Sequence, residues 1–332
     1  MKKHALRWIR IALAIGLLAF LAHKIGHAGA LERLASARLS FIALAVVVVI
    51  ADGMTRAWNW TQLMRAMHIA PKVRYASVLG IHWGGAFLGQ VVPSTVGTDA
   101  LRAMLAARRI GGHVSAHWAA VALLNLISLI LSCAVALGCA VWLQVAGHGA
   151  VRPIVALIFL GALIAAGVGY WLLRTQRGLL LLILRRMRGP LRKLRRGLRR
   201  FMKRLLVFER YDVRAAPVFA IAFVTLVTRA GLYALVGFAV GLSLPFPAWL
   251  ALVPAYMVSG LIPYSVSGYG GDQAAIVYIL TGFGAEAGAA LAFALIAPLM
   301  AMAYNMLGGF SVLFGKLDGR EAALQGEASE RA

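Results

Sequence analysis

The sequence predicts an all-α integral membrane protein, with six transmembrane helices and two broken re-entrant hairpins in an inverted repeat. Of its 332 residues, 61% are hydrophobic and only 14% are charged, whereas soluble domains are about a quarter charged. Two polar segments containing proline and glycine interrupt the apolar sequence. Runs without Asp, Glu, Lys or Arg reach the roughly 20 residues that a crossing helix needs, and they cover 110–151, 153–173, 230–271 and 287–315.

Hydropathy and the positive-inside rule give an order to these elements. The predicted crossing helices are 11–22, 39–60, 114–145, 154–173, 215–241 and 288–314, and the hairpins start at 75 and 250. The basic start MKKHALRWIR and a basic C-terminal region place both termini in the cytoplasm, which predicts a multi-pass protein of the plasma (inner) membrane. We interpret 11–22 as an uncleaved helix, although Ala28-Gly29-Ala30 resembles a signal-peptidase site.

We divide the chain into a first membrane repeat (1–146), a second repeat (147–314) and a disordered cytoplasmic tail (315–332). The second repeat includes a basic amphipathic loop, 174–214, which has 15 Lys or Arg against Glu209 and Asp212. Basic and leucine-rich positions alternate there at helical spacing. Such a segment binds an anionic inner leaflet or enforces topology. We therefore assign the net charge of +23 to membrane contact and expect no nucleic-acid partner.

The two interrupting segments resemble each other. VVPSTVGTDA begins at Val91 and LIPYSVSGYGGDQA begins at Leu261, and both run apolar, Pro, polar, Val, Gly, Asp. Each half contains three crossings, so the second half is predicted to be inverted. Inverted repeats with interrupted helices form the substrate sites of secondary transporters. The residues that we expect to act as hinges are Pro93, Gly97, Pro263, Gly268, Gly270 and Gly271.

Ionisable side chains at membrane depth are costly unless they are paired or face a cavity. They are Asp52, Arg56, His82, Asp99, Arg102, Arg229 and Asp272. With His82 left out, they form our candidate substrate site together with Ser94, Thr95, Ser265, Ser267 and Tyr269. A guanidinium binds phosphate oxygens bidentately, so we assign Arg229 and Arg102 to a lipid phosphate. Helices that start just after Gly97 and Gly270 would add free backbone N–H groups.

Structural roles for the same residues remain open. Asp99 and Asp272 also fit helix N-caps, and Asp52 and Arg56 are spaced i,i+4 and can neutralise each other. A third arrangement comes from a shared spacing: Arg56 precedes Asp99 by 43 residues, and Arg229 precedes Asp272 by 43. That spacing predicts one buried ion pair in each half.

The sequence favours no catalytic or metal chemistry. His113 and His117 are spaced i,i+4, but no glutamate accompanies them, and Cys133 and Cys139 lie in an apolar run. No nucleophile elbow or nucleotide loop appears. We expect a protein that is not an enzyme and that has no metal or cofactor.

The same segments resemble a known family. VVPSTVGTDALRAMLAARRIGG is similar to the first signature of the lysylphosphatidylglycerol synthase membrane-region family, LIPYSVSGYGGDQAAIVYIL and NMLGGF to its second, and WTQLMRAMHI to the segment before the first hairpin. Members are thought to translocate lipids, and some carry an aminoacyl-transferase domain. Two departures concern Gly270-Gly271-Asp272-Gln273, where Gly-Val-Arg-Glu is common, and Leu124-Asn125, where the family often has an acidic-basic pair. The resemblance implies a stand-alone, flippase-like member.

The function we expect is translocation of a phosphate-bearing or anionic lipid by alternating access. The alternatives are an ion- or proton-coupled carrier of a small solute and, as a third reading, an enzyme that modifies lipids within the membrane. The expected partners are membrane lipids, the anionic inner leaflet bound through the basic loop, and a lipid-synthesising enzyme.

Overall fold

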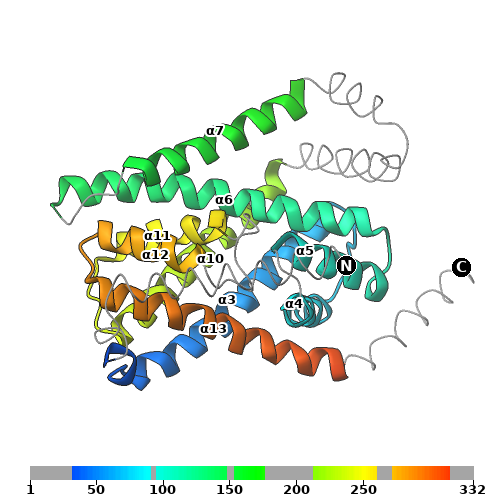
Figure 1. Ribbon diagram of the computed structural model, residues 1–332. Coiled ribbons are helices and arrows are strands. Elements are labelled where there is room, and N and C mark those ends of the chain that lie inside the picture. Colours follow the sequence, from blue (N-terminus) through cyan, green and yellow to red (C-terminus); the bar gives the residue numbers. More distant parts are fainter. Residues whose placement is uncertain (1–31, 91–94, 148–152, 176–211, 260–270, 315–332) are drawn as a thin grey trace, which may run out of the picture.

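The computed structural model describes residues 32–90, 95–147, 153–175, 212–259 and 271–314, and this part of the chain contains helices and no strand. Figure 1 shows the helices as a bundle in which α7 extends away from the others. The helices are α3 (Leu39–Ala66), α4 (Tyr75–Gly89), α5 (Thr95–Arg109), α6 (Val114–Val145), α7 (Pro153–Thr175), α10 (Asp212–Ala239), α11 (Phe246–Ser259), α12 (Gly271–Gly282) and α13 (Ala287–Phe314).

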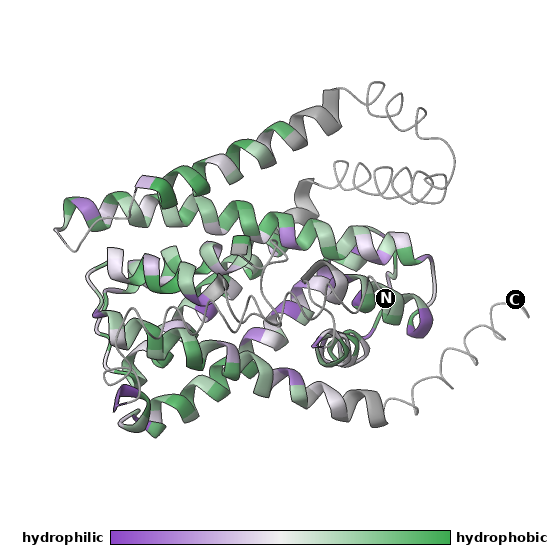
Figure 2. Cartoon of the chain, viewed as in Figure 1, coloured by the Kyte–Doolittle hydropathy of each residue, from purple (hydrophilic) through white to green (hydrophobic). Residues whose placement is uncertain are grey.

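Four described helices are long and apolar enough to cross a membrane: α3, α6, α10 and α13. The predicted span 114–145 has the bounds of α6, and the predicted spans 154–173, 215–241 and 288–314 fall within two or three residues of α7, α10 and α13. The predicted span 11–22 lies outside the described residues. Figure 2 shows hydrophobic residues along most of these helices. The chain is therefore an all-α, multi-pass membrane protein.

Four of the remaining helices are short. Helices α4 and α5 have 15 residues each, α11 has 14 and α12 has 12. At 1.5 Å per residue, the longest extends only about 22 Å, less than the roughly 30 Å hydrocarbon core. None of the four crosses the membrane alone, as expected for the limbs of broken hairpins.

Several helix bounds in the first half have a counterpart in the second half at the same distance along the sequence. Leu39 and Asp212, the first residues of α3 and α10, are 173 positions apart, and so are the last residues of α5 and α12, Arg109 and Gly282. The first residues of α6 and α13 show the same offset. The backbone repeats it as well: φ is +91° at Gly111 and +85° at Gly284.

Helices from the two halves pack directly on each other. Helix α3 lies against α10, α4 against α13, and α6 against α11. The amide of Arg38, just before α3, donates to the carbonyl of Ala239 at the end of α10 (2.9 Å), and the rings of Phe41 and Phe238 are 5.9 Å apart. Since the start of α3 meets the end of α10, these two helices are antiparallel.

The buried apolar residues form two clusters along the bundle. One cluster contains Val49, Cys133 and Ala230, and the other contains Trp60, Leu123 and Ala222. On α3, α6 and α10, polar residues lie between the two clusters: Asp52 and Arg56 on α3, Ser128 on α6 and Thr225 on α10. The fold thus holds a polar layer near the middle of three long helices, with apolar packing toward both ends.

Close helix packing supplies our first prediction. A Cβ on Gly308 of α13 would overlap the carbonyl oxygen of Trp83 on α4, and backbone cannot move aside as a flexible side chain does. Gly308→Ala is expected to destabilise the protein by about 1–3 kcal/mol, the usual cost of overpacking, and to lower the melting temperature in detergent. Gly138→Ala on α6 is the matched control, because nothing lies within 4 Å of that position. An unchanged melting temperature for Gly308→Ala would contradict this packing.

Candidate functional site

The polar layer is organised around an ion pair between two long helices. Arg229 on α10 donates from Nη2 to Oδ2 of Asp52 on α3 at 2.9 Å, and the two side chains are 17% and 8% exposed. Both residues lie near the middle of their 28-residue helices. The pair therefore neutralises two charges where lipid or apolar protein would otherwise surround them.

This pairing differs from two sequence predictions. Asp52 forms its ion pair with Arg229 rather than with Arg56, its i,i+4 neighbour, although its charge also acts favourably on the Arg56 guanidinium. The i,i+4 spacing within α3 did not predict the ion pair, because Arg229 on the neighbouring helix α10 lies within hydrogen-bond distance of Asp52. The predicted partner of Arg229, Asp272, is the second residue of α12, and its side chain lies outside the described residues.

A second polar contact attaches the first hairpin to α6. Asp99 accepts a hydrogen bond from Nη1 of Arg102 at 3.0 Å and another from Nδ2 of Asn125 at 2.6 Å. Asp99 and Arg102 are only 13% and 11% exposed. The predicted pair of Asp99 with Arg56 is therefore wrong, because a residue one turn along α5 supplies the cation.

The start of α5 corrects two further predictions. The helix begins at Thr95, so Gly97 lies inside the first turn rather than before it. Asp99 is consequently in the helix body and is not an N-cap. Helix α12 includes Gly271, which puts Asp272 inside that helix rather than at its cap.

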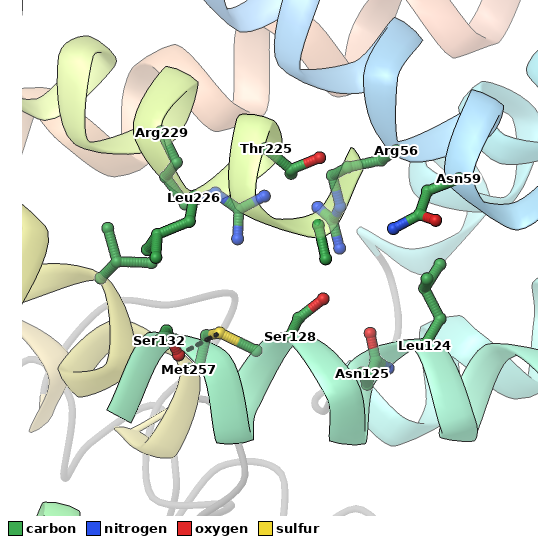
Figure 3. Close-up of a pocket in the computed structure, with 12 residues that line it drawn as sticks. Arg56, Asn59, Leu124, Asn125, Ser128, Ser132, Thr225, Leu226, Arg229 and Met257 are labelled. Carbon is green, nitrogen blue, oxygen red and sulfur yellow. Dashed lines mark hydrogen bonds between the residues drawn. The ribbon is translucent and has the colours of Figure 1, made fainter. Parts of the chain in front are cut away.

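A cavity opens beside the ion pair, between α3, α6, α10 and α11. Its volume is about 40 Å³, and it is lined by Arg56, Asn59, Leu124, Asn125, Ser128, Ser132, Ala222, Thr225, Leu226, Arg229, Val253 and Met257. Figure 3 shows the side chains of Arg229 and Arg56 pointing toward α6, where Ser128 and Asn125 face them. At roughly 10–15 Å³ per water, the cavity holds only about three waters.

Charge is unevenly balanced around this cavity. Asp52 has Arg229 as its partner and Asp99 has Arg102. Within the described part of the chain, Arg56 forms no ion pair or hydrogen bond, although its guanidinium faces the cavity. Among the described residues, the site therefore holds three arginines against two carboxylates, and this excess favours an anionic ligand.

Five polar residues of the lining were not predicted from the sequence: Asn59, Asn125, Ser128, Ser132 and Thr225. A signal does exist for three of them, because positions 125, 128 and 132 lie on one face of the otherwise apolar α6. His82, which we expected at membrane depth, is 4% exposed, and its Nε2 atom has no hydrogen-bond partner among the described residues.

The other predicted site residues are not placed relative to the cavity. Pro93, Ser94, Pro263, Ser265, Ser267, Gly268, Tyr269 and Gly270 lie outside the described residues, as do the side chains of Thr95 and Asp272. Gly271 is the first residue of α12. The roles assigned to these residues stay predictions.

Metal chemistry has no support in the described residues, where no three His, Cys, Asp or Glu side chains gather. The His117 ring nitrogen Nε2 instead contacts the carbonyl oxygen of Gly111 at 2.8 Å. Cys133 and Cys139 are both free thiols.

The fold and the site together define a class: helical multi-pass membrane proteins with a charged, polar-lined cavity between long helices. The family model described as "Lysylphosphatidylglycerol synthase TM region" matches residues 7–309. The chain belongs to this family, which confirms the resemblance seen in the two polar segments. A comparison with curated proteins gives no match. The family is a membrane region, and it agrees with a membrane role connected with lipids.

Proposed function

We propose that this protein is a carrier that translocates a phosphate-bearing or anionic lipid across the membrane by alternating access. The observation that carries the proposal is Arg56, a guanidinium without a carboxylate partner among the described residues, which lines a cavity near the middle of the crossing helices. A guanidinium binds phosphate oxygens through two parallel hydrogen bonds. An arginine at this depth suits a ligand that passes through the membrane interior.

We further propose that the chain crosses the membrane six times, and that α3–α6 and α10–α13 are the halves of an inverted repeat. The offset of 173 residues that several corresponding helix bounds share supports this. Exchanging the two sets of helices also maps the packing onto itself: α4 on α13 corresponds to α11 on α6, and α3 on α6 to α10 on α13. Because α3 and α10 are antiparallel, the exchange inverts one half relative to the other, as in many secondary transporters.

The size of the cavity supports a closed state for this arrangement. About 40 Å³ is far below the 300 Å³ or more of typical ligand pockets. A lipid head group therefore requires α6 and α11 to separate from α3 and α10. The short hairpin helices around the site would allow α6 and α11 to rock as a pair against α3 and α10.

The same small volume favours one alternative, a carrier of a small anionic solute. A solute the size of phosphate needs less opening than a lipid head group, and it would use the same arginine. The two functions differ in whether the ligand must carry acyl chains.

The experiment that separates them uses purified protein in liposomes. Fluorescent phosphatidylglycerol, phosphatidylethanolamine and ceramide are placed in the inner leaflet, and their appearance outside is followed with a membrane-impermeant quencher. We expect the two phosphate-bearing lipids to move on the order of tenfold faster than ceramide, because only they bind the guanidinium. Phosphate efflux without lipid movement would identify the small-solute carrier, and movement of ceramide at the same rate would contradict phosphate recognition.

Topology is the next prediction. We propose that both termini lie in the cytoplasm and that the basic segment 174–214 binds the anionic inner leaflet. With Cys133 and Cys139 replaced by alanine, cysteines at Gly147 and Ser243 are expected to react with an impermeant maleimide added outside intact cells, whereas Lys72→Cys should react only after lysis. All three positions are exposed and lie in connections between helices, so accessibility is matched. External labelling of Lys72→Cys would contradict the orientation.

A further inference from the structure

Arg56 and Arg229 occupy equivalent positions in the two halves. They are 173 positions apart, the offset that relates the bounds of α3 to those of α10. The same offset takes Asp52 to Thr225. By this offset, the positions that correspond to the pair Asp52–Arg229 are Thr225 and Arg56, where a threonine stands in place of the carboxylate.

The geometry of the cavity agrees with this correspondence. Thr225 and Arg56 both line the cavity, and Figure 3 shows them on facing helices on the same side of it. The Thr225 hydroxyl donates to the carbonyl of Ile221 at 2.8 Å, so its proton is already used within α10. Thr225 brings no negative charge, and Arg56 has no other carboxylate at ion-pair distance among the described residues.

We propose that Arg56 is the residue of this site that binds the anionic phosphate group, which occupies the place that a carboxylate would take if the two halves were identical. Arg229 is then a structural residue, held by Asp52, rather than the phosphate ligand that the sequence favoured. This assignment rests on the proposed function, because it names the residue through which the carrier recognises its substrate.

The neighbours of Arg56 suit a phosphate. The hydroxyl of Ser128 and the side chain of Asn59 line the same cavity. Ser128 makes no hydrogen bond within the described part of the chain, so its O–H is available to an oxygen atom of a ligand. Asn125 is less available, since its Nδ2 donates to Asp99. A charged donor on α3 and at least one neutral donor on the facing helix α6 thus line the same cavity.

The first test places a carboxylate beside Arg56. Thr225→Asp is expected to neutralise Arg56 internally and to weaken binding of a phosphate group on the order of ten- to a hundredfold. Thr225→Asn is the matched control, because asparagine has the shape of aspartate without its charge. This variant should bind the phosphate group about as tightly as the wild type. Binding is measured by titrating the full-length protein in detergent with short-chain phosphatidylglycerol in one arm and inorganic phosphate in the other. Binding in both arms points to the phosphate alone, and binding of the lipid only points to a head group with its glycerol backbone.

A second test changes which of the two arginines lacks a carboxylate partner. The double variant Asp52→Thr/Thr225→Asp exchanges the two positions, so Arg56 becomes paired and Arg229 becomes free. It should recover most of the binding that Thr225→Asp alone loses. Arg56→Gln should abolish binding in the wild type, whereas Arg229→Gln should abolish it in the exchanged background. A melting temperature recorded for every variant separates lost binding from lost folding.

Clear outcomes overturn the assignment. Wild-type affinity in folded Thr225→Asp, wild-type affinity in Arg56→Gln, or the absence of saturable binding to the wild type in both arms would each do so. Lipid translocation that persists in Arg56→Gln would reject Arg56 while leaving the proposed function intact. Failure of the wild type to move any lipid of the panel would reject the function itself, whatever the binding results.

Discussion

Asp52→Asn is expected to destabilise the protein by about 3 kcal/mol, because removing one partner of a buried ion pair leaves the other charge uncompensated. Arg229→Gln should have a similar effect, since it leaves Asp52 ionised in the same apolar surroundings. The double variant should be more stable than the sum of the single effects predicts, with a coupling energy on the order of 1–3 kcal/mol. The measurement is a set of unfolding curves in detergent for the wild type and the three variants.

The exposed pair Arg33–Glu286 is the control for this cycle. Its side chains are 41% and 60% exposed at a distance of 2.6 Å, and exposed pairs contribute only about 0–1 kcal/mol. The cycle Arg33→Gln/Glu286→Gln should therefore give a coupling close to zero. Strictly additive effects for Asp52 and Arg229 would contradict a buried pair between α3 and α10.

Asp99→Ala is expected to have the second large effect, on both stability and transport. Asp99 joins two elements, since it accepts from Arg102 within α5 and from Asn125 on α6. Its removal leaves Arg102 without its carboxylate in a site where that side chain is only 11% exposed. A loss of about 3 kcal/mol is expected, together with loss of transport, because the first hairpin is no longer held against α6.

Substitutions of Asn125 distinguish the loss of its hydrogen bond to Asp99 from the addition of a second negative charge. Asn125→Ala removes one neutral donor and should cost about 1–2 kcal/mol, whereas Asn125→Asp sets a second carboxylate against Asp99 and should be worse. The order of melting temperatures expected is wild type, Asn125→Ala, Asn125→Asp. An Asn125→Asp variant as stable as the wild type would show that the contact between α5 and α6 does not depend on this hydrogen bond.

Much of the fold follows from the sequence, because membrane helices are recognised by the hydropathy of consecutive residues. The bounds of α6 were predicted from hydropathy, and the offset of the two polar segments already related Arg56 to Arg229. Each of these features can be seen within a single stretch or by comparing two stretches.

The partners within the site were harder to predict, because they depend on how helices pack. Asp52 and Arg229 are 177 positions apart, and nothing local distinguishes that pairing from the i,i+4 alternative with Arg56. Thr225 looks like an ordinary helix residue until α3 and α10 are seen side by side. Side chains such as Ser128 become site residues only because their face of α6 meets two arginines.

The central claim is that the transported head group passes through the cavity between α3, α6, α10 and α11. Leu124 lines this cavity, and Val141 on the same helix is 65% exposed. With Cys133 and Cys139 replaced by alanine, Leu124→Cys and Val141→Cys are each treated, during turnover in liposomes, with a sulfonatoethyl methanethiosulfonate that fills the space and carries one negative charge. We expect modification at Leu124 to stop translocation of fluorescent phosphatidylglycerol and modification at Val141 to leave it unchanged. Full translocation with the modified cysteine at position 124 would contradict a path through this site.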